Sequence, residues 1–362
     1  MVPYTVLMHK IAFQNSEKYL HSLQKTKVRP GKFLEKMLTK NNCLQLTPVE
    51  FIELLVNTKK PQIFAESEVV GDGTDWNQTE LSILGDIAIS VPVAVFDNGL
   101  HYRPVIYPEP IKATLLFIPG ALLLNGNRQV PADWNEVTDN NQINPKLYDA
   151  LYERRLLPGF IYADRIAQSK NKQAFITIPG LGCGQFAGKF RGHMGAKLKN
   201  ALICFLKKND SRFSNIKAVY FDPYNECDNE RLEINGISFF VHPLTKGNEH
   251  KSQLSEPHTF EEFGDCFKNC ELFSFVAWDH VSWPGNDFYL GHRSTDDGVK
   301  AAATNSMMMM TGVKGTYSIQ SNTYDPPNNF RNWEEVVIKN KIYIHVKDNL
   351  FVLPDKSANM GS

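Results

Sequence analysis

One stretch of the sequence, residues 279–297, gathers side chains that could perform acid–base chemistry. Its ionisable members are Asp279, His280, Asp287, His292, Arg293, Asp296 and Asp297. An apolar run precedes the stretch at 272–277, and a segment of helical composition follows it. A buried strand that ends in carboxylates ahead of a helix is a common arrangement in α/β active sites. Helix capping explains one aspartate of the adjacent pair but not three separate acidic positions, so we interpret the stretch as a candidate site.

Two reactions suit aspartates in this pattern. In the first, carboxylates hydrolyse a glycosidic bond: one orients water or stabilises an oxocarbenium ion, and another handles protons on the leaving group. In the second, aspartate and histidine hold divalent metals for phosphoester hydrolysis. The histidines follow no recognisable metal-ligand spacing, which disfavours the second route. Aromatic residues interleave the acids and could stack on a base or a ribose, although core packing explains them nearly as well.

A glycine-rich segment, residues 180–188, is the second informative stretch. Glycines at four of its nine positions would let backbone amides approach a ligand closely, and the helix expected at 194–206 would point its positive end there. The natural ligand is a phosphate or diphosphate. The glycine spacing matches neither a Walker loop nor the dinucleotide fingerprint. A tight turn between a strand and a helix is the alternative interpretation.

The remaining elements predict how these two stretches are brought together. Short apolar strands, at 114–118, 174–178, 216–221 and 237–241 among others, alternate with helical segments. This alternation predicts an α/β fold with a mixed sheet that is covered by helices on both faces. Two strands end alike, in Phe117-Ile-Pro-Gly120 and Thr177-Ile-Pro-Gly180. We therefore expect both loops at the carboxyl edge of the sheet, where ligands usually bind.

The N-terminal part of the chain has a different composition. We expect residues 1–70 to form a helical extension and residues 71–362 to form the main domain. Within the extension, Thr47-Pro48-Val49-Glu50 is a capping box with proline at the first helical position. A lysine-rich stretch at 25–40 is most simply a solvated helix surface, although it could carry a partner. Three further elements are expected: a helix at 146–156 that ends before Pro158, a helix at 259–268 and an alternating strand at 341–346.

Composition restricts the class of protein. With 42% apolar and 22% charged residues among 362, the chain falls with soluble globular proteins. Its zero net charge argues against a large non-specific nucleic-acid surface. The longest apolar run, 113–124, is interrupted by proline and glycine and is too short to span a bilayer. No signal peptide is expected at Met1. Six scattered cysteines without a CxxC pair fit reduced thiols in a cytosol better than a disulfide framework.

These residues resemble a known family. The segment 174–188, with the helix and strand after it, is similar to the diphosphate-binding loop of macrodomains, and 271–312 resembles divergent macrodomain-like bacterial effectors. Over roughly 110–312, the resemblance implies a macrodomain-like fold. The acidic stretch follows the diphosphate loop here, whereas macrodomains place an asparagine-bearing strand end before it, so either the order is permuted or the equivalence is local.

The resemblance also implies an activity and its residues. It implies an enzyme that binds ADP-ribose and hydrolyses its N-glycosidic bond to arginine of ubiquitin. The catalytic residues that it implies are Asp279, Asp287 and Asp297. The ligand-binding residues expected with them are Gly180, Leu181, Gly182, Cys183, Gly184, Gln185, Phe186, Thr295 and Asp296.

Further expectations follow from the resemblance. The partners would be ADP-ribose, ADP-ribosylated ubiquitin and host proteins of the ubiquitin pathway, without nucleic acid or a membrane span. The protein would be a secreted effector that acts in the host cytoplasm and contributes to virulence. No metal or other cofactor is required by the hydrolytic route, although the aspartates leave Mg²⁺ open. The alternative is a non-catalytic module that reads ADP-ribose or binds a host protein.

Overall fold

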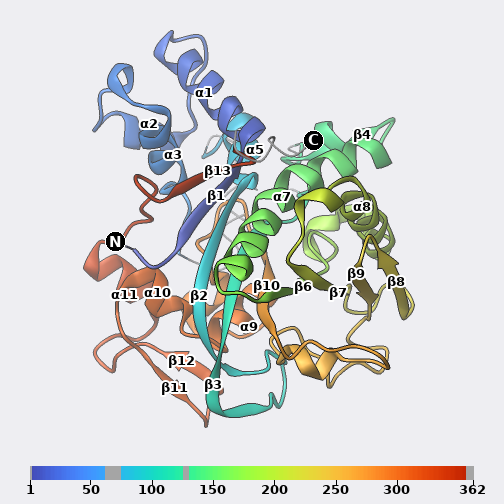
Figure 1. Cartoon of the computed structure of the whole chain (residues 1–362). Helices are drawn as coiled ribbons and strands as arrows, with labels where there is room; N and C mark the ends of the chain where they lie inside the picture. The colour runs from blue at the N-terminus through green and yellow to red at the C-terminus, as the bar shows by residue number, and fades with distance from the viewer. Residues whose placement is uncertain (1, 62–74, 125–129, 356–362) are drawn as a thin grey trace.

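The computed structural model describes residues 2–61, 75–124 and 130–355. Its centre is a nine-stranded sheet (Figure 1). In spatial order the strands are β13 (Leu350–Leu353), β1 (Thr5–His9), β2 (Ile87–Asp97), β3 (Ile106–Pro119), β10 (Cys270–Trp278), β6 (Gln173–Pro179), β7 (Ile216–Asp222), β9 (Ile237–Val241) and β8 (Glu230–Ile234). Strands distant in sequence are therefore neighbours, which is expected where helices connect parallel strands.

Five adjacent strands from β3 to β9 run parallel. β10 lies between β3 and β6, and its last residue, Trp278, pairs with Pro119 at the end of β3. Pro179, at the end of β6, pairs with Asp222 of β7. The carboxyl ends of these strands thus share one edge of the sheet, which confirms the prediction made from the two Ile-Pro-Gly sequences. The acidic stretch begins at the same edge, directly after β10.

Helices cover both faces of the sheet, as predicted. Along β6, Phe175 belongs to one buried cluster and Ile176 to the other, because successive side chains of a strand point to opposite faces. One face carries α7 (Pro145–Ser169) and α8 (Met194–Lys208). The opposite face carries α1 (Lys10–Gln24), α2 (Lys32–Leu38), α3 (Pro48–Val56), α5 (Gln78–Gly85), α9 (Asp296–Ala302), α10 (Ser306–Thr311) and α11 (Trp333–Asn340). The fold is α/β, with helices on both faces of a mixed sheet, and is consistent with a macrodomain-like protein.

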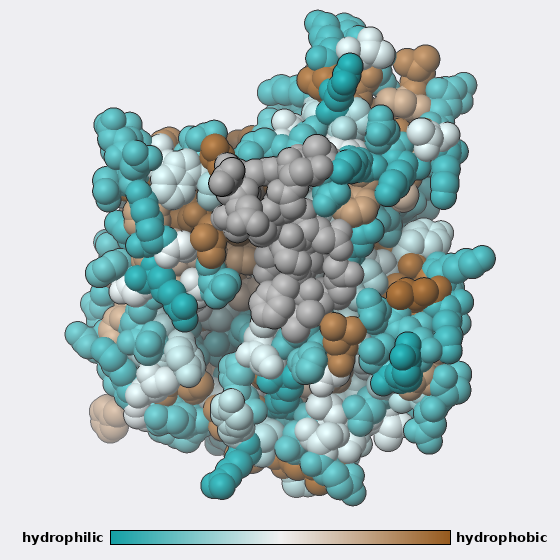
Figure 2. All heavy atoms as spheres, turned by 180° about the vertical axis from the view of Figure 1, so that it is seen from behind, coloured by the Kyte–Doolittle hydropathy of each residue, from teal (hydrophilic) through white to brown (hydrophobic). Residues whose placement is uncertain are grey.

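Short elements complete the chain. They are α6 (Trp134–Val137), the hairpin of β4 (Thr138–Asp139) and β5 (Gln142–Ile143), and the hairpin of β11 (Thr316–Ser318) and β12 (Thr323–Asp325). Seen from behind, hydrophilic residues cover most of the surface in view, and hydrophobic ones are scattered among them (Figure 2). Within the described residues, every helix is too short or too polar to cross a membrane. All six cysteines are unpaired.

The N-terminal region is not purely helical, which corrects the prediction for residues 5–9. β1 pairs with β2 and β13 inside the main sheet. Its apolar residues are buried on both faces, so the segment favours a sheet over a surface helix. The predicted capping box is confirmed: Thr47 accepts from the Glu50 amide, and Glu50 accepts from the Thr47 amide. The predicted division after residue 70 lies outside the described residues and stays a prediction.

Two predicted helix boundaries are wrong because tertiary packing overrides local signals. α7 continues through Pro158 to Ser169. At Gly159 a Cβ atom would lie 3.2 Å from Ile118 and Phe275, so the helix packs closely on the sheet at this point. The helix expected at 259–268 is only a 3-10 turn, Pro257–Phe260. Phe260 and Phe267 both pack against Phe175, at ring-centroid distances of 4.7 and 5.0 Å, and the irregular chain between them permits both contacts.

The strand expected at 341–346 is also absent from the described structure. Ile344 and Val346 are buried, as the alternation predicted, but side chains rather than a neighbouring strand satisfy their backbone groups. The Ile344 amide donates to Asn57 Oδ1, and Asn57 Nδ2 donates to the Ile344 carbonyl, both at 2.8 Å. The Val346 amide donates to Glu53 Oε2 at 2.7 Å. The pattern therefore predicted burial correctly and pairing incorrectly.

Candidate functional site

The candidate site forms where three loops leave adjacent strands. The acidic stretch leaves β10 between the loop after β3, residues 120–124, and the glycine loop after β6, residues 180–188. The Leu123 amide donates to the Phe186 carbonyl at 2.8 Å and joins the two flanking loops. The Phe186 ring meets the His280 ring edge-on, with 6.1 Å between centroids. The structure therefore brings the two stretches singled out in the sequence into contact.

The glycine loop is shaped by contact with its neighbour. A Cβ atom at Gly120 would lie 2.2 Å from the Gly182 amide nitrogen, so the two backbones touch. Gly182 also has a φ of +71°, which favours glycine. The amides of Leu181 and Cys183 donate within the loop, to Pro179 and Gly180. Within the described part of the chain, the amides of residues 184–186 have no backbone acceptor, so they are the donors best suited to an anion.

The glycine loop leads into α8 through a short helix. This 3-10 helix, Gln185–Phe190, begins within the loop and precedes α8. At the first turn of α8, the Gly195 amide donates to Glu226 Oε2 at 2.6 Å. A carboxylate of the protein thus engages one amide of this helix terminus. The expectation that α8 points its positive end at a bound phosphate stays a prediction.

Asp279 is buried at the carboxyl end of β10. Its Oδ2 atom accepts hydrogen bonds from Ser282 Oγ at 2.6 Å and Asn286 Nδ2 at 2.7 Å. The buried Lys59 ammonium donates to the backbone carbonyls of Asp279, at 3.1 Å, and His280, at 2.6 Å. Burial lowers the pKa of Lys59 well below its usual value, and the nearby Asp279 carboxylate acts in the opposite direction. Lys59 therefore fixes the backbone that carries Asp279.

Asp297 approaches the same turn from the start of α9. Its Oδ1 atom accepts from the Gly285 amide at 2.7 Å, whereas Oδ2 has no hydrogen-bond partner among the described residues. Burial, and then repulsion from Asp279, raises the pKa of the Asp297 carboxyl well above its usual value. Burial therefore favours the protonated form of Asp297. The structure thus brings Asp279 and Asp297 together across one turn.

Other buried polar atoms in this stretch also lack partners. They are Asn286 Oδ1, His280 Nδ1, the Tyr289 hydroxyl and Arg293 Nε, each without a hydrogen bond to the described residues. Native proteins seldom leave buried polar atoms unsatisfied, and a ligand or an ordered water usually accounts for the exceptions. Five such atoms within residues 280–297, counting Asp297 Oδ2, support the interpretation of this stretch as a binding site.

Asp287 points away from this turn and organises the chain around it. Its Oδ2 atom accepts from the amides of Ser294, at 2.8 Å, and Thr295, at 3.1 Å, and Oδ1 accepts from Thr295 Oγ1 at 2.5 Å. A Cβ atom at Gly298 would lie 1.7 Å from Asp287 Oδ1, so the carboxylate rests directly on α9. Both oxygens are engaged by the protein. Asp287 thus holds α9, and with it Asp297, in position.

The two predicted ligand-binding residues at the start of α9, Thr295 and Asp296, also form hydrogen bonds within the protein. Thr295 caps the helix by accepting from the Gly298 amide at 2.9 Å. Asp296 accepts from the Ala277 amide at 2.9 Å and forms an ion pair with Lys300 at 2.9 Å. These contacts tie α9 to β10. Ligand binding by Thr295, Asp296 and the residues of the glycine loop stays a prediction.

A buried ionic network behind the site was missed in the sequence. Arg155 of α7 donates to both oxygens of Asp133, at 2.9 and 2.7 Å, to the Gly120 carbonyl at 2.8 Å and to Asp86 at 3.2 Å. Although burial alone would raise the pKa of Asp133, Arg155 and His280 hold it below its usual value. The one available signal was an arginine on the otherwise apolar face of a helix, beside Leu151 and Leu156.

His280 belongs to the acidic stretch and connects it to this network. Its Nε2 atom lies 3.3 Å from Asp133 Oδ2 and 3.4 Å from Arg155. Burial lowers the pKa of His280, so the neutral ring is favoured. A neutral ring that donates from Nε2 to Asp133 would carry an acceptor lone pair on Nδ1. His280 was noted in the acidic stretch but was not assigned a role from sequence.

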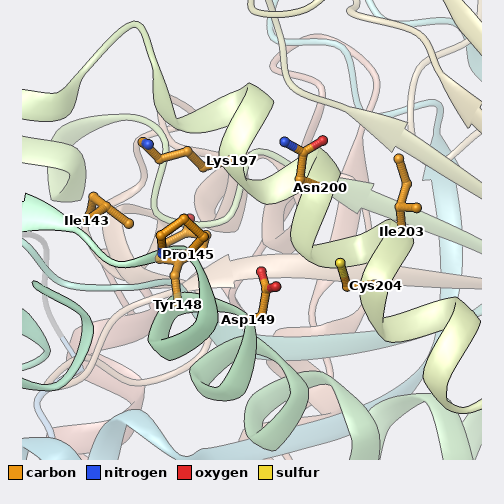
Figure 3. A pocket seen from close by; sticks show the side chains of 8 residues that line it. All are labelled: Ile143, Pro145, Tyr148, Asp149, Lys197, Asn200, Ile203 and Cys204. Carbon is orange, nitrogen blue, oxygen red and sulfur yellow. The ribbon is translucent and has the colours of Figure 1, made fainter.

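A hollow elsewhere on the surface does not include these residues. It has a volume of about 390 Å³ and lies between α7 and α8 (Figure 3). Its lining consists of Ile143, Pro145, Tyr148, Asp149, Lys197, Asn200, Ile203 and Cys204. The acids of the candidate site are instead buried in a closed arrangement. The hydrogen bonds and unpaired polar atoms, rather than the size of the hollow, therefore single out the candidate site.

The geometry agrees with a comparison of the sequence with protein families. A family model described as the macrodomain effector MavL matches residues 4–330. The chain belongs to this family of macrodomain effectors. Among curated proteins, no sequence matches the chain. Membership confirms the resemblance to divergent macrodomain-like effectors, and it indicates a function related to ADP-ribose in a secreted bacterial effector. The matched range contains the glycine loop, the acidic stretch and β1.

Replacing Asp287 by alanine should destabilise the protein. Three partly buried donors would lose their acceptor. A fully buried donor left without a partner costs about 1–3 kcal/mol, so a total loss of about 2 kcal/mol in the free energy of unfolding is expected for the three together. Urea unfolding would measure it, with Asp139→Ala, at an exposed position, as the control. Equal stabilities of the two variants would show that Asp287 is not a structural anchor.

Asp297→Asn should stabilise the protein increasingly as pH rises. The pKa of Asp297 is higher in the folded than in the unfolded state, so the folded state retains a proton that the unfolded state releases. Stability of the wild type should therefore fall as pH rises from about 4, the unfolded value, towards the raised folded pKa. Asparagine keeps an acceptor for Gly285 without this penalty. Thermal unfolding across pH would measure the difference, and a pH-independent difference would contradict the assignment.

Proposed function

We propose that the protein is an ADP-ribosylhydrolase that removes ADP-ribose from arginine of ubiquitin. One observation carries the proposal: the turn shared by Asp279 and Asp297 lies beside the glycine loop, with His280 against Phe186. A diphosphate on the amides of residues 184–186 would place the attached ribose towards this turn. Membership of the macrodomain effector family supports an ADP-ribose ligand. The arginine linkage and ubiquitin come from the resemblance described above.

The two acids suit different parts of such a reaction. The substrate carries a guanidinium group on the anomeric carbon, and the transition state develops positive charge on the ribose. The Asp279 carboxylate, fixed by Ser282, Asn286 and the Lys59-held backbone, would pair with this charge and stabilise it. The protonated Asp297 has an oxygen free to exchange a proton or to position water. Asp287 would act indirectly, by holding α9 and therefore Asp297 in position.

The proposed route requires no metal. Water attacks the anomeric carbon, the bond from that carbon to the guanidinium nitrogen breaks, and arginine leaves as its guanidine. The guanidine takes up the proton that the attacking water loses. In this route, side chains of the acidic stretch orient the water and stabilise the charge. The proposed reaction includes no Mg²⁺, so we expect that a chelator does not reduce turnover.

Asp279→Asn should abolish most turnover and retain the ligand. The amide keeps the shape of the side chain but lacks the negative charge, so hydrolysis should fall by about 100-fold or more. Calorimetric titration should give an ADP-ribose affinity within a few-fold of the wild type. Mass spectrometry would follow release from arginine-ADP-ribosylated ubiquitin. Binding without release by the wild type would instead favour a reader of ADP-ribose, and absence of binding would reject the macrodomain-type site.

Gly184→Val should weaken ADP-ribose binding. Gly184 is exposed, and a Cβ atom there would meet nothing within 4 Å. The larger side chain would cover the adjacent amides and exclude a diphosphate. Calorimetry should show that the valine variant binds about tenfold or more weakly, and that Gly184→Ala lowers the affinity less. Unchanged affinity in the valine variant would remove this loop from the binding site.

A further inference from the structure

A concentrated cationic surface on the N-terminal helices takes no part in the candidate site. Residues 25–40 carry six cationic side chains and one acidic one, in a chain whose net formal charge is zero. We call residues 25–40 the basic turn. Its six cationic residues are Lys25, Lys27, Arg29, Lys32, Lys36 and Lys40, and all of them are exposed. Because the remainder of the chain has an excess of acid, the positive charge is gathered in one place.

Hydrogen bonds anchor the base of the basic turn and leave its side chains in solvent. Five consecutive exposed residues, 25–29, follow the end of α1. Beyond them, Asn77 Nδ2 donates to the Arg29 carbonyl at 3.0 Å, and the Gly31 amide donates to Glu80 at 2.8 Å. The base of the segment is thus anchored beside α5, while its side chains face solvent. In Figure 1, α1 and α2 stand out from the sheet at the upper left.

Four of the six cations have no counter-charge among the residues that the structure describes. Among the described residues, Lys25, Lys27, Arg29 and Lys40 form no ion pair, and the Lys36 ammonium lies 5.4 Å from the centroid of the Phe33 ring. Neighbouring like charges without counter-charges repel one another. A polyanionic surface would relieve that repulsion and would release its own counterions.

Exposed aliphatic side chains border the cations. Gln24 Nε2 donates to the Cys43 carbonyl at 3.2 Å, which places the 3-10 helix Cys43–Gln45 beside the end of α1. Leu44 on that helix is 71% exposed, and Val28 within the basic turn is 39% exposed. Lysines interspersed with exposed aliphatic residues are typical of surfaces that rest on anionic membranes.

We propose that the basic turn docks the protein on an anionic phospholipid bilayer. Lipid phosphates would lie between the cations, and Val28 and Leu44 would enter the headgroup layer. Five of the six cations are lysines, which protein interfaces disfavour relative to arginine. Single-stranded nucleic acid usually requires exposed aromatic platforms, whereas the exposed apolar residues here are aliphatic. This inference does not rest on the proposed hydrolase activity.

Vesicle co-sedimentation of the full chain tests the proposal. We expect binding to phosphatidylcholine vesicles that contain phosphatidylserine, and not to pure phosphatidylcholine vesicles. The binding should be strong near 0.1 M salt and lost near 1 M, where the screening length falls from about 10 to about 3 Å. A variant with Lys25→Gln, Lys27→Gln and Arg29→Gln should bind on the order of 100-fold more weakly, at about fivefold per cation.

A control variant separates position from charge. It carries Lys112→Gln, Lys207→Gln and Lys268→Gln, three exposed lysines outside the basic turn. It has the same net charge as the first variant and should bind as the wild type does. Because all six substituted residues are exposed, both variants should unfold at the wild-type temperature.

A second variant tests the aliphatic contribution. Val28→Ser with Leu44→Ser should weaken vesicle binding several-fold and leave its salt dependence unchanged. Failure of the wild type to bind anionic vesicles, or equal weakening in both triple variants, would overturn the proposal. So would binding to single-stranded RNA without binding to vesicles.

Discussion

The candidate site depends on one buried cation, the guanidinium group of Arg155. It contacts the loop after β3, the end of α5 and the Asp133 carboxylate, and it lies against His280. A charge in this environment is tolerated only if its donors are satisfied, because removing one partner leaves the other charge buried and unpaired. The loops at the carboxyl edge are therefore constrained by an electrostatic requirement as well as by packing. Lys59 adds a second cation, bound to backbone carbonyls rather than to the acids themselves.

The three aspartates of the acidic stretch divide into two roles. Asp287 has both oxygens occupied and sets the start of α9. Asp279 and Asp297 share the turn at 282–286, and burial, followed by repulsion from Asp279, raises the pKa of Asp297. Two carboxyl groups whose surroundings differ in this way are the usual basis for distinct acid and base functions. The division rests on hydrogen bonds and burial, and neither is visible in the spacing of the residues.

Local sequence predicted the elements around the site well. Short apolar strands ending in Ile-Pro-Gly indicated a shared sheet edge, and that edge is where the loops converge. The errors arose where distant residues supplied partners. α7 continues past Pro158 because it packs on the sheet. The side chains of Asn57 and Glu53, rather than a neighbouring strand, bond the backbone of residues 341–346. Arg155, Asp133 and Lys59 were missed for the same reason: their charges are balanced by residues far away in the chain.

The place of β10 in the sheet links the formation of the fold to the formation of the site. β3 and β6 precede it in sequence, yet both pair with β10 and not with each other. Until residue 278 has been made, these two strands lack their common neighbour and keep open edges, which are prone to unwanted pairing. The segment that closes the gap is the one that carries Asp279 at its end. During synthesis, the sheet therefore becomes continuous only when the first acid of the site has already reached its edge.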